Sequence, residues 1–164
     1  MNQIVLIGTS HEYQHCGKPG ADVFERFIMS HLDSPTFTAI AEEMSCEALS
    51  EQGTAQSVGS QVACQRDIRH LYCDPNSQTR NRLGVRQEAE IRIAASFANH
   101  SEERVRQLIQ ESYDLREQYW LDQILTLDCW PVLFICGANH VDSFRTKIEA
   151  RGLSASILTR DWSP

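Results

Sequence analysis

The segment Ile4-Val5-Leu6-Ile7-Gly8-Thr9-Ser10-His11 decides the fold class of this chain. Its four consecutive apolar residues predict a short strand that is buried on both faces, as strands of parallel sheets are. Gly8 ends the apolar run, and a histidine follows three residues later. The segment Val132-Leu133-Phe134-Ile135-Cys136-Gly137-Ala138-Asn139-His140 repeats this arrangement near the other end of the chain. We therefore expect two buried strands that each lead into a Gly-x-x-His turn.

Further strands and helices are expected to alternate between these two segments and after them. Strands are predicted over Phe37–Glu43, Ile68–Cys73 and Leu153–Leu158. Helices are predicted over Val23–Leu32, Ser45–Gln65, Val85–Asn99, Ser101–Leu125 and Val141–Arg151, with Asp33-Ser34-Pro35 ending the first of them and loops over residues 9–20 and 74–84. This alternation predicts a single α/β domain over residues 1–164, with a mostly parallel sheet of about five strands and helices on both faces.

Composition limits the class of protein. The chain has 164 residues, 41% of them hydrophobic, and a formal net charge of −7, which is typical of one folded domain. Such an acidic chain is not expected to bind nucleic acid or anionic membranes, which require a positive surface. The N-terminus has no basic leader, and no apolar run approaches the roughly 18 residues of a membrane span, so a cytoplasmic protein is expected.

The cysteines and one tryptophan bear on metal binding and on oligomeric state. The six cysteines form no Cys-x-x-Cys pair, so they are expected to be reduced thiols and not a zinc knuckle. An exposed Trp162 is a candidate dimer contact, and the oligomeric state, monomer or homodimer, stays open.

The two histidines are expected to face one site. In open parallel sheets ligands bind beyond the carboxyl ends of the strands, where the strand order reverses, so His11 and His140 are expected to meet there. Glu42 and Glu43 end the second predicted strand, and alternation directs only one of them to the same crevice. Two imidazoles and a carboxylate suit zinc, manganese, iron or cobalt.

An arginine on the longest predicted helix adds a fourth group. Arg116 lies within the apolar stripe that includes Ile109 and Trp120. Because a guanidinium keeps its charge, Arg116 needs a carboxylate, a phosphate or a row of carbonyls. It is expected to pair with Glu43 or to bind an anionic substrate.

Other polar residues and motifs are given ordinary roles. His15 is expected at the surface or in a substrate loop, while His31, His70 and His100 are expected to be solvated. Asp74 is expected to stabilise the turn after the third strand, and Arg80 and Arg82 to border the substrate. A Walker loop, a phosphatase Cys-x5-Arg motif, a GxGxxG fingerprint and a GxSxG elbow are all absent from the sequence.

Taken together, these motifs resemble the superfamily of erythromycin esterase, ChaN, TraB and TIKI proteins. The resemblance rests on Gly8-Thr9-Ser10-His11, Glu43-Met44, Leu115-Arg116-Glu117-Gln118-Tyr119-Trp120 and Gly137-Ala138-Asn139-His140. The chain departs from the family pattern at Leu115, where an acidic residue is usual, and at Glu117, where Asn or Asp is usual. The resemblance implies a site of His11, Glu43, Arg116 and His140, and it favours Glu43 over Glu42. It also implies esterase, metal-dependent peptidase, or haem- or iron-binding activity.

The resulting hypothesis is a metal-dependent hydrolase of the peptidase or esterase type that acts on a small-molecule or peptide substrate. His11, Glu43 and His140 are expected to hold a divalent ion (Mn, Zn, Co or Fe), or one histidine to act as general base for water. Arg116 is expected to orient Glu43 or to stabilise an oxyanion. The alternatives are a metal- or haem-binding protein without turnover, and a scaffold whose histidines only cap helices.

Overall fold

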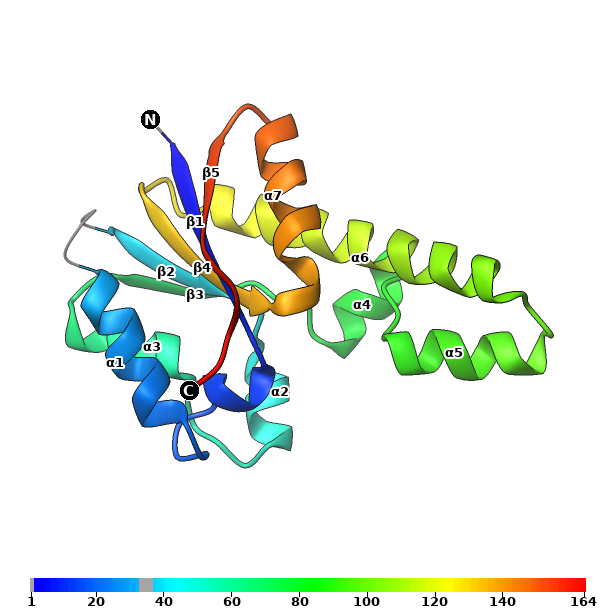
Figure 1. Cartoon of the computed structure of the whole chain (residues 1–164), viewed down its shortest axis with the longest axis horizontal. Coiled ribbons are helices and arrows are strands. Elements are labelled where there is room, and N and C mark those ends of the chain that lie inside the picture. Colours follow the sequence, from blue (N-terminus) through cyan, green and yellow to red (C-terminus); the bar gives the residue numbers. More distant parts are fainter. Residues whose placement is uncertain (1, 33–36) are drawn as a thin grey trace.

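Five parallel strands form one sheet that lies between two layers of helices (Figure 1). The computed structural model describes residues 2–32 and 37–164. The strands are β1 (Gln3–Thr9), β2 (Ala39–Glu42), β3 (Arg69–Tyr72), β4 (Val132–Gly137) and β5 (Ser154–Trp162), in the spatial order β3-β2-β4-β1-β5. The predicted α/β fold, with a parallel sheet of about five strands, is confirmed.

Helices cover both faces of this sheet. Helices α1 (Ala21–His31) and α3 (Val58–Gln65) pack on one face, and α6 (Glu102–Leu125) and α7 (Val141–Ala150) pack on the other. Side chains of β1 alternate between the two: Ile7 faces Phe24 of α1, whereas Leu6 faces Trp120 of α6. Residues 4–9 of β1 and all of β4 are buried, as their unbroken apolar sequence predicts.

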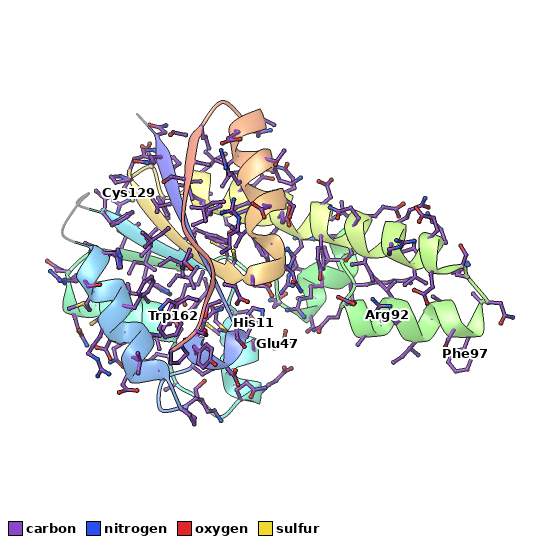
Figure 2. The ribbon with its side chains drawn as sticks, in the orientation of Figure 1. His11, Glu47, Arg92, Phe97, Cys129 and Trp162 are labelled. Carbon is purple, nitrogen blue, oxygen red and sulfur yellow. The ribbon has the colours of Figure 1, made fainter. Side chains whose placement is uncertain are left out.

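A helical arm projects from this body (Figure 1). Helix α5 (Glu88–Phe97) lies against the N-terminal half of α6 through a small apolar cluster built on Ile91, Ala95 and Val105. Figure 2 shows Phe97 at the far end of the arm, away from the sheet. The base of the arm lies next to the strand ends and so forms one side of the site described below.

The remaining elements correct several sequence-based expectations. Residues 74–84 were expected to form a loop but contain helix α4 (Ser77–Leu83), whose start is capped by the Asn76 side chain and whose end is the left-handed Gly84. The predicted helix Ser45–Gln65 is split into α2 (Cys46–Glu51) and α3. The loop over 9–20 includes the short 3-10 helix η1 (His11–Gln14), and a second one, η2 (Ala138–His140), follows β4.

The C-terminal tryptophan also differs from expectation. Trp162 is buried, and its ring packs against Tyr13, Phe24 and Phe27. It therefore belongs to the core and offers no exposed aromatic surface for a dimer. The Asp33-Ser34-Pro35 helix stop lies outside the described residues. None of the helices in the described part combines the length and apolar character needed to cross a bilayer.

Candidate active site at the carboxyl edge of the sheet

The two Gly-x-x-His motifs leave the sheet side by side. Strands β1 and β4 pair directly, with Gly8 opposite Cys136 and Thr9 opposite Gly137. His11 begins η1 and His140 ends η2, so both imidazoles lie just beyond the same edge (Figure 2 labels His11). The Nε2 atoms of His11 and His140 lie 3.5 and 3.8 Å from Oε1 of Glu43. The structure thus brings together two residues that are 129 positions apart in the sequence.

Glu43 is the carboxylate at the centre of the site. Its side chain is fully buried, and its Oε2 accepts a hydrogen bond of 2.7 Å from the backbone N–H of Gly137. Burial on its own raises the pKa of Glu43, but the charges of Arg116 and His11 outweigh burial and hold that pKa well below its ordinary range. Glu43 is therefore ionised at neutral pH.

Glu42 points to the opposite face of the sheet, as alternation along a strand requires. Its Oε1 accepts hydrogen bonds from the Ser57 hydroxyl and from Nε2 of His70, the latter at 2.6 Å. The choice of Glu43 over Glu42 therefore agrees with the geometry. His70, which was expected to be solvated, is instead paired with a buried carboxylate.

Arg116 holds two buried carboxylates together. Its Nη1 lies 3.0 Å from Oε1 of Glu43, while its Nε and Nη2 donate to the two oxygens of Asp74 at 2.6 and 2.8 Å. Burial alone lowers the pKa of Arg116, but Glu43 and Asp74 hold it above its ordinary value. Of the two roles expected for Arg116, pairing with Glu43 is the one that the structure contains.

Asp74 was expected to stabilise the turn after the third strand, but its contacts extend beyond that turn into the site. Besides its bidentate pair with Arg116, it accepts hydrogen bonds from the Trp120 indole N–H at 3.0 Å and from Arg80 at 2.6 Å. Arg80 is thus engaged with Asp74, and neither Arg80 nor Arg82 lines the pocket at the two histidines. Because Asp74 follows β3, the strand-edge argument used for Glu43 would also have placed it near the site.

His140 is fixed by a carboxylate that sequence reasoning missed. Its Nδ1–H donates to Oε1 of Glu117 at 2.9 Å, and the Ser143 hydroxyl donates to the same oxygen at 2.6 Å. The ring is buried beside Tyr113 and Trp120, with centroids 4.2 and 4.9 Å away. Because a carboxylate oxygen can only accept, we assign the proton of the neutral ring to Nδ1, which leaves the lone pair on Nε2 at the side of the pocket. The one sequence feature that pointed to Glu117 as a site residue was its position next to Arg116.

His11 has a different environment, since its side chain is 52% exposed. The negative charge of Glu43 is the main cause that raises the pKa of His11 above the ordinary value of 6.5, while partial burial opposes this. The amide nitrogen of the buried Gln14 lies 3.3 Å from Nδ1 of His11, and the amide oxygen of Gln14 has no hydrogen-bond partner among the described residues. Rotation of that amide presents either a donor or an acceptor, so Gln14 suits both protonation states of His11.

The glycine of the second motif provides space for these groups. A Cβ atom at Gly137 would lie 3.3 Å from both Oε2 of Glu43 and Nε2 of His11. A side chain there would displace the carboxylate or the imidazole. Gly8 serves the neighbouring strand instead, because a Cβ atom there would overlap the backbone carbonyl of Arg160 in β5. Both glycines therefore permit close approaches that other residues would block.

A pocket of about 390 Å³ opens over the site. All four residues predicted from the sequence line it, together with Thr9, Ser10, Arg86, Gln87, Glu88, Tyr113, Gly137, Ala138, Asn139 and Asp161. Its volume is near the lower end of the roughly 300–1,000 Å³ that is usual for small-molecule sites. Most of the residues that line it are polar or charged, which does not suit the large apolar faces of haem.

The residues match a metal site in kind but not in arrangement. Imidazole and carboxylate ligands suit the expected divalent ions. However, the Arg116 guanidinium already lies against the oxygen of Glu43 that both imidazoles face. Within residues 2–32 and 37–164, no group of three or more His, Cys, Asp or Glu side chains is placed to hold a metal ion.

His15 was expected at the surface or in a substrate loop, but neither location is observed. It is buried, and its Nδ1 lies 3.2 Å from the Thr54 hydroxyl. It does not line the pocket at His11 and His140. Burial lowers its pKa below 6.5, so it is neutral at pH 7.

Comparison with known proteins adds no relative from which a function can be transferred. No known protein-family model matches the chain, and neither a curated protein nor a solved structure is significantly similar to it. Function is therefore inferred below from the geometry of the site.

The contrast between His11 and His15 gives a prediction that needs no substrate. Attraction to Glu43 favours protonated His11, whereas burial favours neutral His15, so NMR titration is expected to give a midpoint above 6.5 for His11 and below 6.5 for His15. Because its folded-state pKa is raised, His11 contributes stability that is fully present below pH 6.5 and lost as pH rises through the raised value. In Glu43→Gln the His11 midpoint should fall towards 6.5 while that of His15 stays in place. An unchanged His11 midpoint would contradict the pairing.

Proposed function

We propose that this chain is a hydrolase of the peptidase or esterase type, in which His140 activates water and His11 protonates the leaving group. One observation carries the proposal: His140 is held by Glu117 through Nδ1, and its Nε2 faces the same carboxylate as the half-exposed His11, inside one small pocket. A base that is oriented by a carboxylate, next to an acid whose pKa is raised, is an arrangement suited to general acid–base catalysis.

The proposed reaction has two steps. In the first, Nε2 of His140 removes a proton from water, the water oxygen bonds to the carbonyl carbon of the substrate, and the π electron pair of the carbonyl moves to its oxygen, which becomes an oxyanion. In the second, the oxyanion re-forms the carbonyl group, the C–N or C–O bond to the leaving group breaks, and the departing amine or alcohol takes a proton from His11. His140 then releases its proton and His11 takes one up from solvent, which restores the starting state.

Glu43 and Arg116 keep the two histidines in these states. The Glu43 carboxylate maintains the proton on His11, and Arg116 maintains the charge of Glu43. Arg116 also lines the pocket, so its positive charge lies near the place where the oxyanion would form. Glu117 stabilises the imidazolium that forms on His140.

The experiment that tests this function is a screen of p-nitrophenyl esters and aminoacyl p-nitroanilides with the purified chain. We expect release of p-nitrophenol or p-nitroaniline by the wild type and its loss in His11→Gln and His140→Gln. The matched control is His100→Gln, because His100 is exposed and lies outside this pocket. Equal rates in all four proteins would reject the proposal.

The divalent metal predicted from the sequence is tested with the same proteins. Because Arg116 lies against the shared Glu43 oxygen, we expect hydrolysis to survive dialysis against a chelator. Metal content, measured by mass spectrometry, should then show no stoichiometric Mn, Zn, Co or Fe. One equivalent of such an ion in the wild type, lost in both His11→Gln and His140→Gln, would instead favour the metal-dependent form of the hypothesis.

A further inference from the structure

Two charged side chains at the pocket have no charged partner among the residues that the structure describes. Arg86 and Asp161 both line the pocket and are exposed, and neither makes a side-chain hydrogen bond or ion pair with any residue in the described part of the chain. The pocket's other carboxylates do have partners: Glu43 pairs with Arg116, and Glu88 pairs with Arg92 at 2.8 Å. The charges left for a ligand are therefore one positive and one negative.

An unpartnered arginine is unusual in this chain. Among the arginines of residues 2–32 and 37–164, only Arg82 shares this property with Arg86. The others each form an ion pair or a hydrogen bond. Arg86 lines the pocket and Arg82 does not, so Arg82 is a control with the same side chain at a different place.

The backbone of Arg86 is fixed although its side chain is free. The buried Ser112 hydroxyl donates to the carbonyl oxygen of Arg86 at 2.6 Å and accepts from its N–H at 2.8 Å. This double contact ties the residue to α6 immediately before α5 begins. A guanidinium on a fixed backbone at a pocket wall is arranged to bind an oxyanion, because less conformational entropy is lost on binding.

The two free charges come from different walls. Arg86 belongs to the base of the helical arm, whereas Asp161 belongs to β5, next to the residue that pairs with Thr9 of β1. The two histidines line the same pocket.

We infer that the pocket takes a small zwitterionic substrate of the dipeptide class, with its carboxylate on Arg86 and its ammonium group at Asp161. The inference rests on the proposed function for the bond that is cleaved, and it adds the chemical class of the substrate. Arg86 and Asp161 are specificity-determining residues in this account, not catalytic ones.

Binding of three small probes tests the inference without turnover. Glycylglycine carries both charges, N-acetylglycine only the negative one and glycinamide only the positive one. By NMR titration at pH 7, the wild type should bind glycylglycine most tightly. Arg86→Ala should weaken binding of glycylglycine and N-acetylglycine at least tenfold, a loss of about 1.4 kcal/mol, and leave glycinamide unchanged. Asp161→Asn should weaken glycylglycine and glycinamide and leave N-acetylglycine unchanged.

Two further variants separate charge from shape. Arg86→Lys should retain part of the N-acetylglycine affinity because it keeps the charge, whereas Arg82→Ala should match the wild type. Equal binding of the three probes, failure of all three to bind, or an Arg86→Ala protein that binds N-acetylglycine like the wild type would overturn the inference.

The failure of this inference can be told apart from failure of the proposed function. Charge-selective binding without hydrolysis of any ester or anilide would sink the hydrolase proposal and leave the zwitterion site standing. Hydrolysis that depends on His140 but is equally fast for substrates with neutral and charged ends would reject the zwitterion site and support the hydrolase proposal.

Discussion

Replacement of His140 by glutamine is expected to lower kcat/KM for a hydrolysed substrate by about two to four orders of magnitude, which is what a positioned general base contributes. Glutamine fills much of the space beside Tyr113 and Trp120 but cannot accept a proton from water at neutral pH. The loss should appear mainly in kcat, because His140 acts on the reacting water and not on the substrate's ends.

Glu117→Gln is the companion variant. It keeps an oxygen that can accept from Nδ1–H but removes the charge that stabilises the imidazolium. We expect a smaller loss than in His140→Gln, and the double variant should be no slower than His140→Gln alone, because the two residues act as a unit. Multiplicative losses would show that Glu117 does not act through His140.

The second large effect concerns stability. Arg116→Met is expected to destabilise the fold by about 3–5 kcal/mol, because it leaves Glu43 and Asp74 buried and short of their shared cation. Chemical denaturation at pH 7 measures this difference. The matched control is Arg92→Met, which breaks the exposed pair with Glu88 on the arm and should leave the free energy of unfolding close to the wild-type value.

The pH dependence of that difference follows from Glu43. Its pKa is depressed in the folded wild type, so pairing with Arg116 contributes stability above the ordinary value of 4.5 and loses it as pH falls through the depressed value. In Arg116→Met burial acts without this cation, so the carboxyl group is protonated more readily. The difference in free energy of unfolding between Arg116→Met and the wild type should therefore become smaller as the pH falls. A variant within 1 kcal/mol of the wild type at pH 7 would contradict the role of Arg116.

Sequence patterns predicted the sheet because the signal is local and strong. The short, β-branched apolar runs ended by Gly8 and Gly137 favour strands buried on both faces, and their common edge then follows from the rule for parallel sheets. Direct pairing of β1 with β4 is what makes the two histidines neighbours. That pairing is a long-range property that the sequence pattern does not encode.

Prediction was weaker where tertiary contacts override local preference. Asn76 and Gly84 are cap residues as well as loop residues, so helix α4 was taken for a loop. Glu117 was not assigned to the site because an ion pair across the fold leaves no periodic signal in the sequence. Asp74 was missed for another reason: its position after β3 was interpreted as a turn and not as part of the strand edge. Trp162 was taken to be exposed because its position near the chain end gave no sign of the aromatic cluster that buries it.

The tautomer of His140 tests the central claim most directly, because it needs neither a substrate nor an assumption about the bond that is cleaved. Long-range ¹H–¹⁵N NMR of the neutral ring, assigned by comparison with His140→Gln, reports which nitrogen carries the proton. The account predicts a proton on Nδ1, donated to Glu117, and an unprotonated Nε2 at the pocket. A neutral ring with its proton on Nε2 would have no base to offer to water and would contradict the account.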